Sequence, residues 1–196
     1  MTHRREAILK TAAGLFAEKG YKETSMAEVA RISGVAQGTI FYHFKNKEEL
    51  FIAVLDDFRA SVTREFEKLL QDKSATGLEM AGDALNFYLF LAGSMEDQFR
   101  ILHRLHAYEL ARSNPVCRAH LEAIYNCFLD IFERAILLGQ KDGSVRAMPA
   151  RKLALILFSM VDGLVRFNTY DLYDGAVLSD ELLDSCRRIL ANFDIP

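Results

Sequence analysis

The chain has 196 residues, of which 51% are hydrophobic and only three are proline. This length and composition exclude a disordered chain and indicate a compact helical protein with a real core. The formal net charge of −3 is unevenly divided: residues 1–50 hold eight Lys or Arg and six Asp or Glu, a net of +2, and residues 51–196 carry −5. Because binding depends on local charge, the balance permits a basic, nucleic-acid-binding head on an acidic body.

Apolar residues recur with helical spacing along the whole chain, and no segment alternates with period two for long enough to predict a strand. We therefore predict an all-α protein of about nine helices, separated by breaks that carry turn residues. The predicted helices span residues 2–19, 25–32, 36–43, 47–72, 76–93, 95–112, 115–140, 149–168 and 178–193.

Residues 24–50 contain two short helices joined by a glycine turn. Ser25 and Glu28 have the spacing of a capping box at the start of the first helix. Gly34 follows that helix and accepts the left-handed backbone that ends helices. We predict a helix-turn-helix.

The second of these helices, 36–43, is expected to bury Ile40 and Phe44 and to turn small and hydrogen-bonding side chains outward. A short helix with such an outer face fits the major groove of DNA. The segment therefore predicts a DNA-binding site.

Residues 8–50 resemble the amino-terminal domain of the TetR (tetracycline repressor-like) family of bacterial transcriptional regulators. The matching blocks are Ala12–Tyr21, Ser33–Val35, Gly38–Phe44 and Lys45–Leu50. The resemblance implies a three-helix DNA-binding domain over residues 1–60, which includes the start of the linking helix, and a ligand-binding and dimerisation bundle over residues 61–196.

The resemblance further implies a homodimer that binds a palindromic DNA operator and is released from it by a small apolar or aromatic effector. An effector-independent DNA-binding or scaffolding protein is the main alternative. An all-helical enzyme is not expected, because the sequence contains no phosphate loop, nucleophile elbow, zinc motif or Cys–His arrangement.

Carried over by position, the family's DNA contacts fall in and around the helix-turn-helix. Base reading is expected from the start of the second helix, where Gln37 could pair with adenine and Gly38 lets the backbone approach. Phe41 stands where the family often has Tyr, and it either packs on a thymine methyl or sugar or belongs to the core. Tyr42 could also be an unused surface residue, and the Thr39 hydroxyl a helix-stabilising one. The full predicted set is Thr24, Ser25, Arg31, Ala36, Gln37, Gly38, Thr39, Phe41, Tyr42, His43 and Lys47.

Helix 95–112, drawn on a helical wheel, has His106 and Glu109 on or beside an apolar face. Buried ionisable groups need partners, so these two residues either anchor a ligand or form a pair within the core. A metal site with His103 is a third alternative; we expect no metal and no cofactor. The predicted pocket residues are Phe87, Phe90, Phe99, Leu102, His106, Glu109, Tyr125 and Phe128.

Helix 149–168 is apolar on two sides, which predicts burial on both. One side faces the protomer's core, and the other faces either more of the same chain or a second copy. The resemblance implies the second copy, through an interface of two helices from each chain. With helix 115–140 as the partner helix, the dimer interface implied in this way consists of Leu121, Phe128, Phe132, Leu153, Leu157, Met160, Leu164 and Phe167.

No run of 18 apolar residues is present, and the amino terminus lacks the apolar core of a signal peptide. Cys117, Cys127 and Cys186 are odd in number and lack metal-ligand spacing, which suits reduced thiols packed as small apolar residues. We therefore expect a cytoplasmic protein without a membrane partner.

Overall fold

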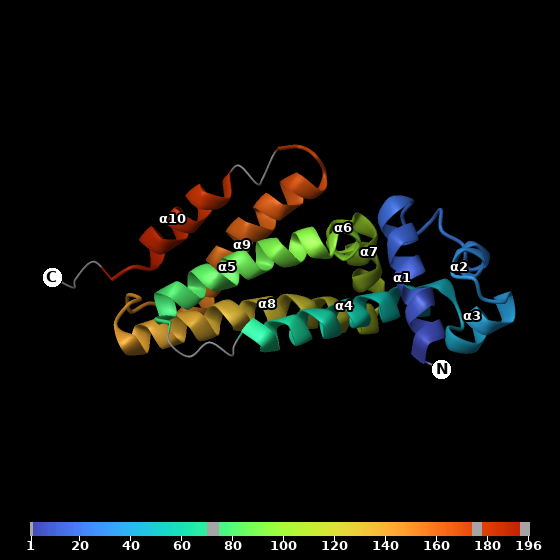
Figure 1. Cartoon of the computed structure of the whole chain (residues 1–196), viewed down its shortest axis with the longest axis horizontal. Helices are drawn as coiled ribbons and strands as arrows, with labels where there is room; N and C mark the ends of the chain where they lie inside the picture. The colour runs from blue at the N-terminus through green and yellow to red at the C-terminus, as the bar shows by residue number, and fades with distance from the viewer. Residues whose placement is uncertain (1, 70–74, 174–177, 193–196) are drawn as a thin grey trace. The chain divides into compact units, whose positions relative to one another are not determined.

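The computed structural model describes residues 2–69, 75–173 and 178–192, which form ten α-helices (Figure 1). Over these residues the all-α prediction is confirmed, and the only β feature is an isolated bridge between Val145 and Ala191. None of the described helices is long and apolar enough to cross a membrane. The helices are α1 (Thr2–Glu18), α2 (Met26–Ile32), α3 (Gln37–His43), α4 (Lys47–Leu69), α5 (Gly77–Ser94), α6 (Glu96–His103), α7 (Leu105–Ser113), α8 (Pro115–Asp142), α9 (Ala150–Thr169) and α10 (Ser179–Leu190).

Most predicted helix boundaries agree with the structure within two residues. The predicted ends at 70–72 and 193 lie outside the described residues. The prediction of one helix over 95–112 is wrong, because the chain is extended at Arg104 (φ −74°, ψ 143°) and forms α6 and α7 instead. No glycine or proline marks this break, so its cause is tertiary rather than local.

The chain divides into two compact units, defined here as unit 1 (Met1–Val62 and Met95–Ile124) and unit 2 (Thr63–Ser94 and Tyr125–Pro196). Unit 1 therefore contains α6, α7 and the start of α8 together with the helix-turn-helix. The functional division at residue 60 stays a prediction.

In unit 1, α1 packs against both α2 and α6. The buried face of α1 carries Ile8, Ala12, Leu15 and Phe16 at helical spacing. The Phe16 ring lies 5.3 Å from that of Phe51 in α4. These contacts give the short helices α2 and α3 a rigid base, which they need because seven residues do not make a stable helix alone.

In unit 2, α5 packs against α9 and α10. Its first residue, Gly77, lies so close to α8 that a Cβ atom there would be 1.9 Å from the Gly139 nitrogen. Further along α5, the buried Tyr88 donates a hydrogen bond to Asp162 of α9 at 2.6 Å. Both contacts fix the core of this unit.

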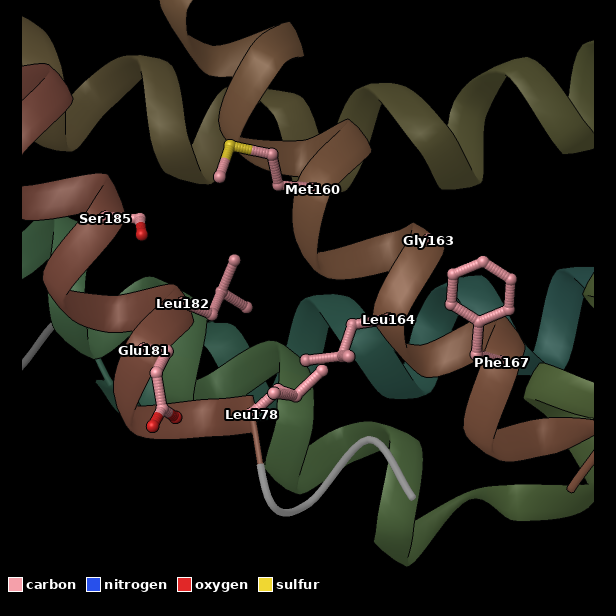
Figure 2. Close-up of a pocket in the computed structure, with 8 residues that line it drawn as sticks. All are labelled: Met160, Gly163, Leu164, Phe167, Leu178, Glu181, Leu182 and Ser185. Atoms are coloured by element: carbon pink, nitrogen blue, oxygen red, sulfur yellow. The ribbon is translucent and has the colours of Figure 1, made fainter. Parts of the chain in front are cut away.

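The outer side of α9 is apolar but not covered within the described residues. Ile156 and Phe167 are 47% and 45% exposed, and Met160 and Gly163 lie between them at helical spacing. Beside this stripe, an open groove of about 400 Å³ runs between α9 and α10 (Figure 2). Its lining residues are Met160, Gly163, Leu164, Phe167, Leu178, Glu181, Leu182 and Ser185.

Cys117, Cys127 and Cys186 form no disulfide. Cys117 and Cys186 are buried, and burial raises the pKa of each thiol to about 11. Such thiols stay protonated near neutral pH and pack as small apolar groups.

Candidate nucleic-acid interface

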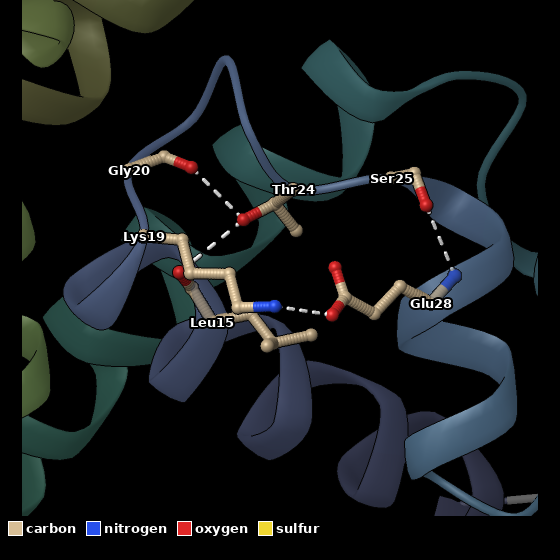
Figure 3. Close-up of polar contacts among 6 residues, drawn as sticks. All are labelled: Leu15, Lys19, Gly20, Thr24, Ser25 and Glu28. Carbon is tan, nitrogen blue, oxygen red and sulfur yellow. Dashed lines mark hydrogen bonds and ion pairs between the residues drawn. The ribbon is translucent and has the colours of Figure 1, made fainter.

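Ser25 caps the start of α2 as the sequence predicts, but only one of the two hydrogen bonds of a capping box is formed. The Ser25 hydroxyl accepts a hydrogen bond from the Glu28 amide at 3.1 Å (Figure 3). The Glu28 carboxylate does not return to Ser25; it pairs at 2.5 Å with Nζ of Lys19, the residue that follows α1. This exposed pair adds little to stability, yet it links α1 to α2.

The turn between α2 and α3 has the predicted left-handed glycine, with Gly34 at φ +70°. The α3 helix that follows is anchored by Ile40 and Phe44, which are 0% and 2% exposed. The confirmed burial of these two residues fixes which side of α3 faces outward.

The outward side of α3 carries most of the predicted base-reading residues. Ala36, Gln37 and Gly38 are exposed, and a Cβ atom at Gly38 would meet nothing within 4 Å. Tyr42 is 75% exposed and Phe41 is 47% exposed, so Phe41 is not a core residue. The structure therefore brings these five residues to one surface, with Thr39 and His43 half-buried beside them and Arg31 exposed on α2.

Thr24 and Lys47 have structural roles that sequence reasoning missed. Thr24 is 1% exposed, and its hydroxyl contacts the Leu15 and Gly20 carbonyl oxygens at 3.2 and 2.9 Å (Figure 3). Lys47 Nζ donates to the carbonyl oxygens of Tyr21, Lys22 and Thr24 at 2.7–3.2 Å. An ammonium group has three donors, so Lys47 has none left for a phosphate in this arrangement.

We expect Lys47→Ala to weaken DNA binding by loosening the loop between α1 and α2, and to leave the salt dependence of binding unchanged. Each phosphate contact adds about 0.9 to the slope of log K against log salt, so the slope reports direct contacts. Measuring affinity over a salt series separates the two roles. A slope lowered by about 0.9 for each protomer on the DNA, or about 1.8 for a dimer, would contradict this assignment and indicate a direct contact between Lys47 and a phosphate. Lys45→Ala is the matched control, because Lys45 is an exposed lysine two residues away.

One candidate contact was absent from the sequence-based set. Arg4 of α1 lines a surface hollow of about 330 Å³ together with Gly38, Thr39, Tyr42 and His43 of α3. Its exposed guanidinium could meet a phosphate beside the recognition helix. The signal was the His-Arg-Arg run in the first five residues.

The eight predicted pocket residues are divided equally between the two units. Phe99, Leu102, His106 and Glu109 belong to unit 1, whereas Phe87, Phe90, Tyr125 and Phe128 belong to unit 2.

Because α6 and α7 are separate helices, the wheel that placed these residues on one face does not apply. Glu109 and Leu105 are exposed, and His103 is buried. In unit 2, Phe90 is 64% exposed.

Most of the predicted dimer residues lie inside the protomer. Leu121, Phe128, Phe132, Leu153 and Leu157 are at most 5% exposed and have no surface to offer a partner. Met160, Leu164 and Phe167 line the open groove between α9 and α10. Of the two apolar sides of helix 149–168, the outward one is therefore the side that carries Ile156 and Phe167.

Both the helix-turn-helix region and the rest of the chain are similar to known proteins. A family model described as bacterial regulatory proteins, tetR family, matches residues 8–54. The fatty acid metabolism regulator protein of Bacillus subtilis (strain 168) is 26% identical over 182 residues, which cover 90% of each chain.

Two solved structures share the fold. A protein from Saccharomonospora viridis in complex with choline has a TM-score of 0.86 at 23% identity, over 98% of this chain and 100% of its own. The transcriptional regulator FadR from Bacillus subtilis in complex with stearoyl-CoA has a TM-score of 0.77 at 24% identity, over 94% of this chain and 98% of its own.

Proposed function

Because the chain belongs to the tetR family of bacterial regulatory proteins, we propose that it is a dimeric repressor that binds a palindromic operator and is released by a small apolar or aromatic molecule. The family consists of DNA-binding transcriptional regulators rather than enzymes. The proposal rests on the outward side of α3, whose opposite side is buried through Ile40 and Phe44. The exposed residues on the outward side are Ala36, Gln37, Gly38, Phe41 and Tyr42.

We assign base reading to Gln37 and Gly38, and positioning on the sugar-phosphate backbone to Ser25, Tyr42 and Arg4. Gln37 can pair bidentately with adenine, and Gly38 leaves room for close approach. Phosphate contacts orient the head without reading sequence. With few side chains that reach bases, specificity must come largely from two heads at a fixed separation.

We expect Gln37→Ala to relax base preference at one position of each half-site and to leave the other positions unchanged. A bidentate pair contributes about 1–3 kcal/mol of discrimination against the wrong base. Sequence selection from a random duplex library, run with both proteins, measures this directly. Identical selected motifs would remove Gln37 as a base reader. Gln98→Ala on α6 is the matched control.

For the dimer, we propose that the outer stripe of α9 and the neighbouring groove against α10 meet the same surfaces of a second copy. The exposed apolar residues Ile156 and Phe167 lie on one side of α9 with the half-buried Met160 between them, and contiguous exposed apolar surface marks interaction sites. A two-fold axis would pair this surface with itself. This assignment replaces the pairing of helices 115–140 and 149–168.

For the effector, we propose a site in unit 2 around Tyr88 and Asp162. The rings of Phe128 and Phe158 lie 4.8 and 5.5 Å from that of Tyr88, and Tyr125 lies 5.8 Å from Phe158. A polar pair within an aromatic lining is typical of small-molecule sites. Tyr125 and Phe128 remain from the predicted set, and Tyr88 and Asp162 are added. Because the rings pack on one another, binding there requires them to separate, which would give the ligand its preference for one conformer.

A further inference from the structure

Arg104 separates α6 from α7, and its side chain contacts the end of α1. One guanidinium nitrogen donates to the carbonyl oxygens of Ala17 and Glu18, the latter at 3.2 Å. These are among the last carbonyls of α1, which have no partner within the helix. A cation at a helix carboxyl end is also favoured by the helix dipole. Arg104 therefore caps a helix that lies some 86 residues earlier in the sequence.

His106, two residues after Arg104, contacts the loop that follows α1. Its ring stacks on that of Tyr21, with centroids 3.8 Å apart and an interplanar angle of 17°. It also meets Phe51 of α4 edge-on at 5.2 Å. Lys47 Nζ lies 4.5 Å from the centroid of the same Tyr21 ring. Tyr21 is thus held by two elements, α7 and α4.

The loop held in this way leads directly into the DNA-binding helices. Residues 20–24 connect α1 to Ser25, the cap of α2, and α2 packs against α3. Gly20 has φ +86°, and a Cβ atom there would lie 3.2 Å from Arg104 Nη1. The loop therefore has little freedom while the Arg104 and His106 contacts are made.

We propose that Arg104 and His106 are positioning residues for DNA binding, which hold the end of α1 and the following loop so that α2 and α3 are presented in one orientation. The inference rests on the proposed function and adds to it a contact between the α6–α7 junction and the loop, made by residues that do not lie on the recognition surface. Because the break at Arg104 has no glycine or proline to impose it, the same contacts also account for the separation of α6 from α7.

The charge state of His106 gives the proposal a separate signature. Its Nε2 is buried without a hydrogen-bond partner among the described residues, and burial lowers the pKa of the ring. Around it, Lys47 of α4 and Lys22 of the loop also lower the pKa, while Glu109 of α7 and Glu48 of α4 raise it. A ring with a lowered pKa in the folded state is neutral at pH 7. The stability it contributes is present above the unfolded pKa of 6.5 and falls as the pH decreases below that value.

The test uses the full chain and a duplex selected from a random library by the wild-type protein, with a scrambled duplex beside it. We expect Arg104→Gln and His106→Ala each to weaken operator binding about tenfold, within the range seen for mutations that couple sites indirectly. Arg104→Lys should recover most of the affinity, because the ammonium can still cap α1. Arg112→Gln, at an exposed arginine of α7, should bind like wild type.

Two further readouts separate positioning from general destabilisation. Amide hydrogen exchange should speed up at residues 20–24 in Arg104→Gln and His106→Ala, and stay unchanged in α5. His106→Phe keeps the stacked ring but cannot be protonated, so it should bind like wild type at pH 8 and lose less affinity than wild type at pH 5.5.

Operator affinities of Arg104→Gln and His106→Ala equal to that of wild type would overturn the inference and leave the proposed function intact. Faster exchange throughout the chain would also overturn it. If Arg104→Gln does not fold, the affinity of Arg104→Lys and the pH profile of His106→Phe decide: a pH profile identical to wild type removes His106 from the proposal. Wild-type protein that does not prefer the selected duplex over the scrambled one would instead contradict the proposed function.

Discussion

Replacing Gly38 by glutamate is expected to reduce operator binding by at least about 30-fold, because each of the two DNA-binding domains of the dimer would lose base contacts of a kind that contribute about 1–3 kcal/mol, about 2–6 kcal/mol for the dimer. The added carboxylate would also face the phosphates of the groove. The fold should not suffer, since a side chain at this position meets nothing within 4 Å. Glutamate in a helix is favoured over glycine by about 0.5–1 kcal/mol, so the melting temperature should stay the same or rise slightly.

Gly93→Glu is the matched control, because Gly93 is an exposed helical glycine of α5 with equally open surroundings. Both variants add one negative charge to the chain, so a general electrostatic effect would appear in both. Equal operator affinity of the two variants would remove α3 from the DNA interface.

The double substitution Ile156→Glu with Phe167→Glu is expected to convert the dimer to a monomer and to weaken operator binding by about 10²–10⁴-fold, the range by which linking two binding modules raises affinity. Four carboxylates would meet across the proposed two-fold interface without partners. Both side chains are about half exposed in the protomer, so the helices themselves should remain. Sedimentation velocity and circular dichroism measure the two effects separately.

Phe90→Glu provides the control for this experiment, because Phe90 is 64% exposed on α5 and lies outside the proposed interface. It should remain dimeric. A double variant that still sediments as a dimer would move the interface away from α9 and α10.

The sequence predicted the DNA-binding head well because its signals are local. A capping serine, a left-handed glycine and the alternation of buried Ile40 and Phe44 with exposed neighbours each act within a few residues. The structure confirms all three. Local rules could not say what Thr24 and Lys47 do, because their partners are backbone carbonyls set by the fold of the loop between α1 and α2.

Residues 61–196 were predicted less well, because the contacts that determine how their helices pack are long-range. Helical periodicity correctly marked 149–168 as apolar on two sides, but which side faces inward depends on how α5, α9 and α10 pack. The break at Arg104 lies where that side chain contacts the end of α1, and it invalidates any helical wheel drawn across residues 95–112. The predicted pocket and interface both depend on these long-range contacts, which a helical wheel does not contain.

Selection of duplexes from a random library with the wild-type protein, followed by footprinting, tests whether two copies of the exposed face of α3 read a symmetric operator. We expect an enriched inverted repeat whose half-site centres lie one helical turn apart, about 10–10.5 base pairs, or a multiple of it. We also expect Gly38→Glu to leave no footprint. Enrichment of no sequence, or of a single site without two-fold symmetry, would show that α3 does not read DNA in this way.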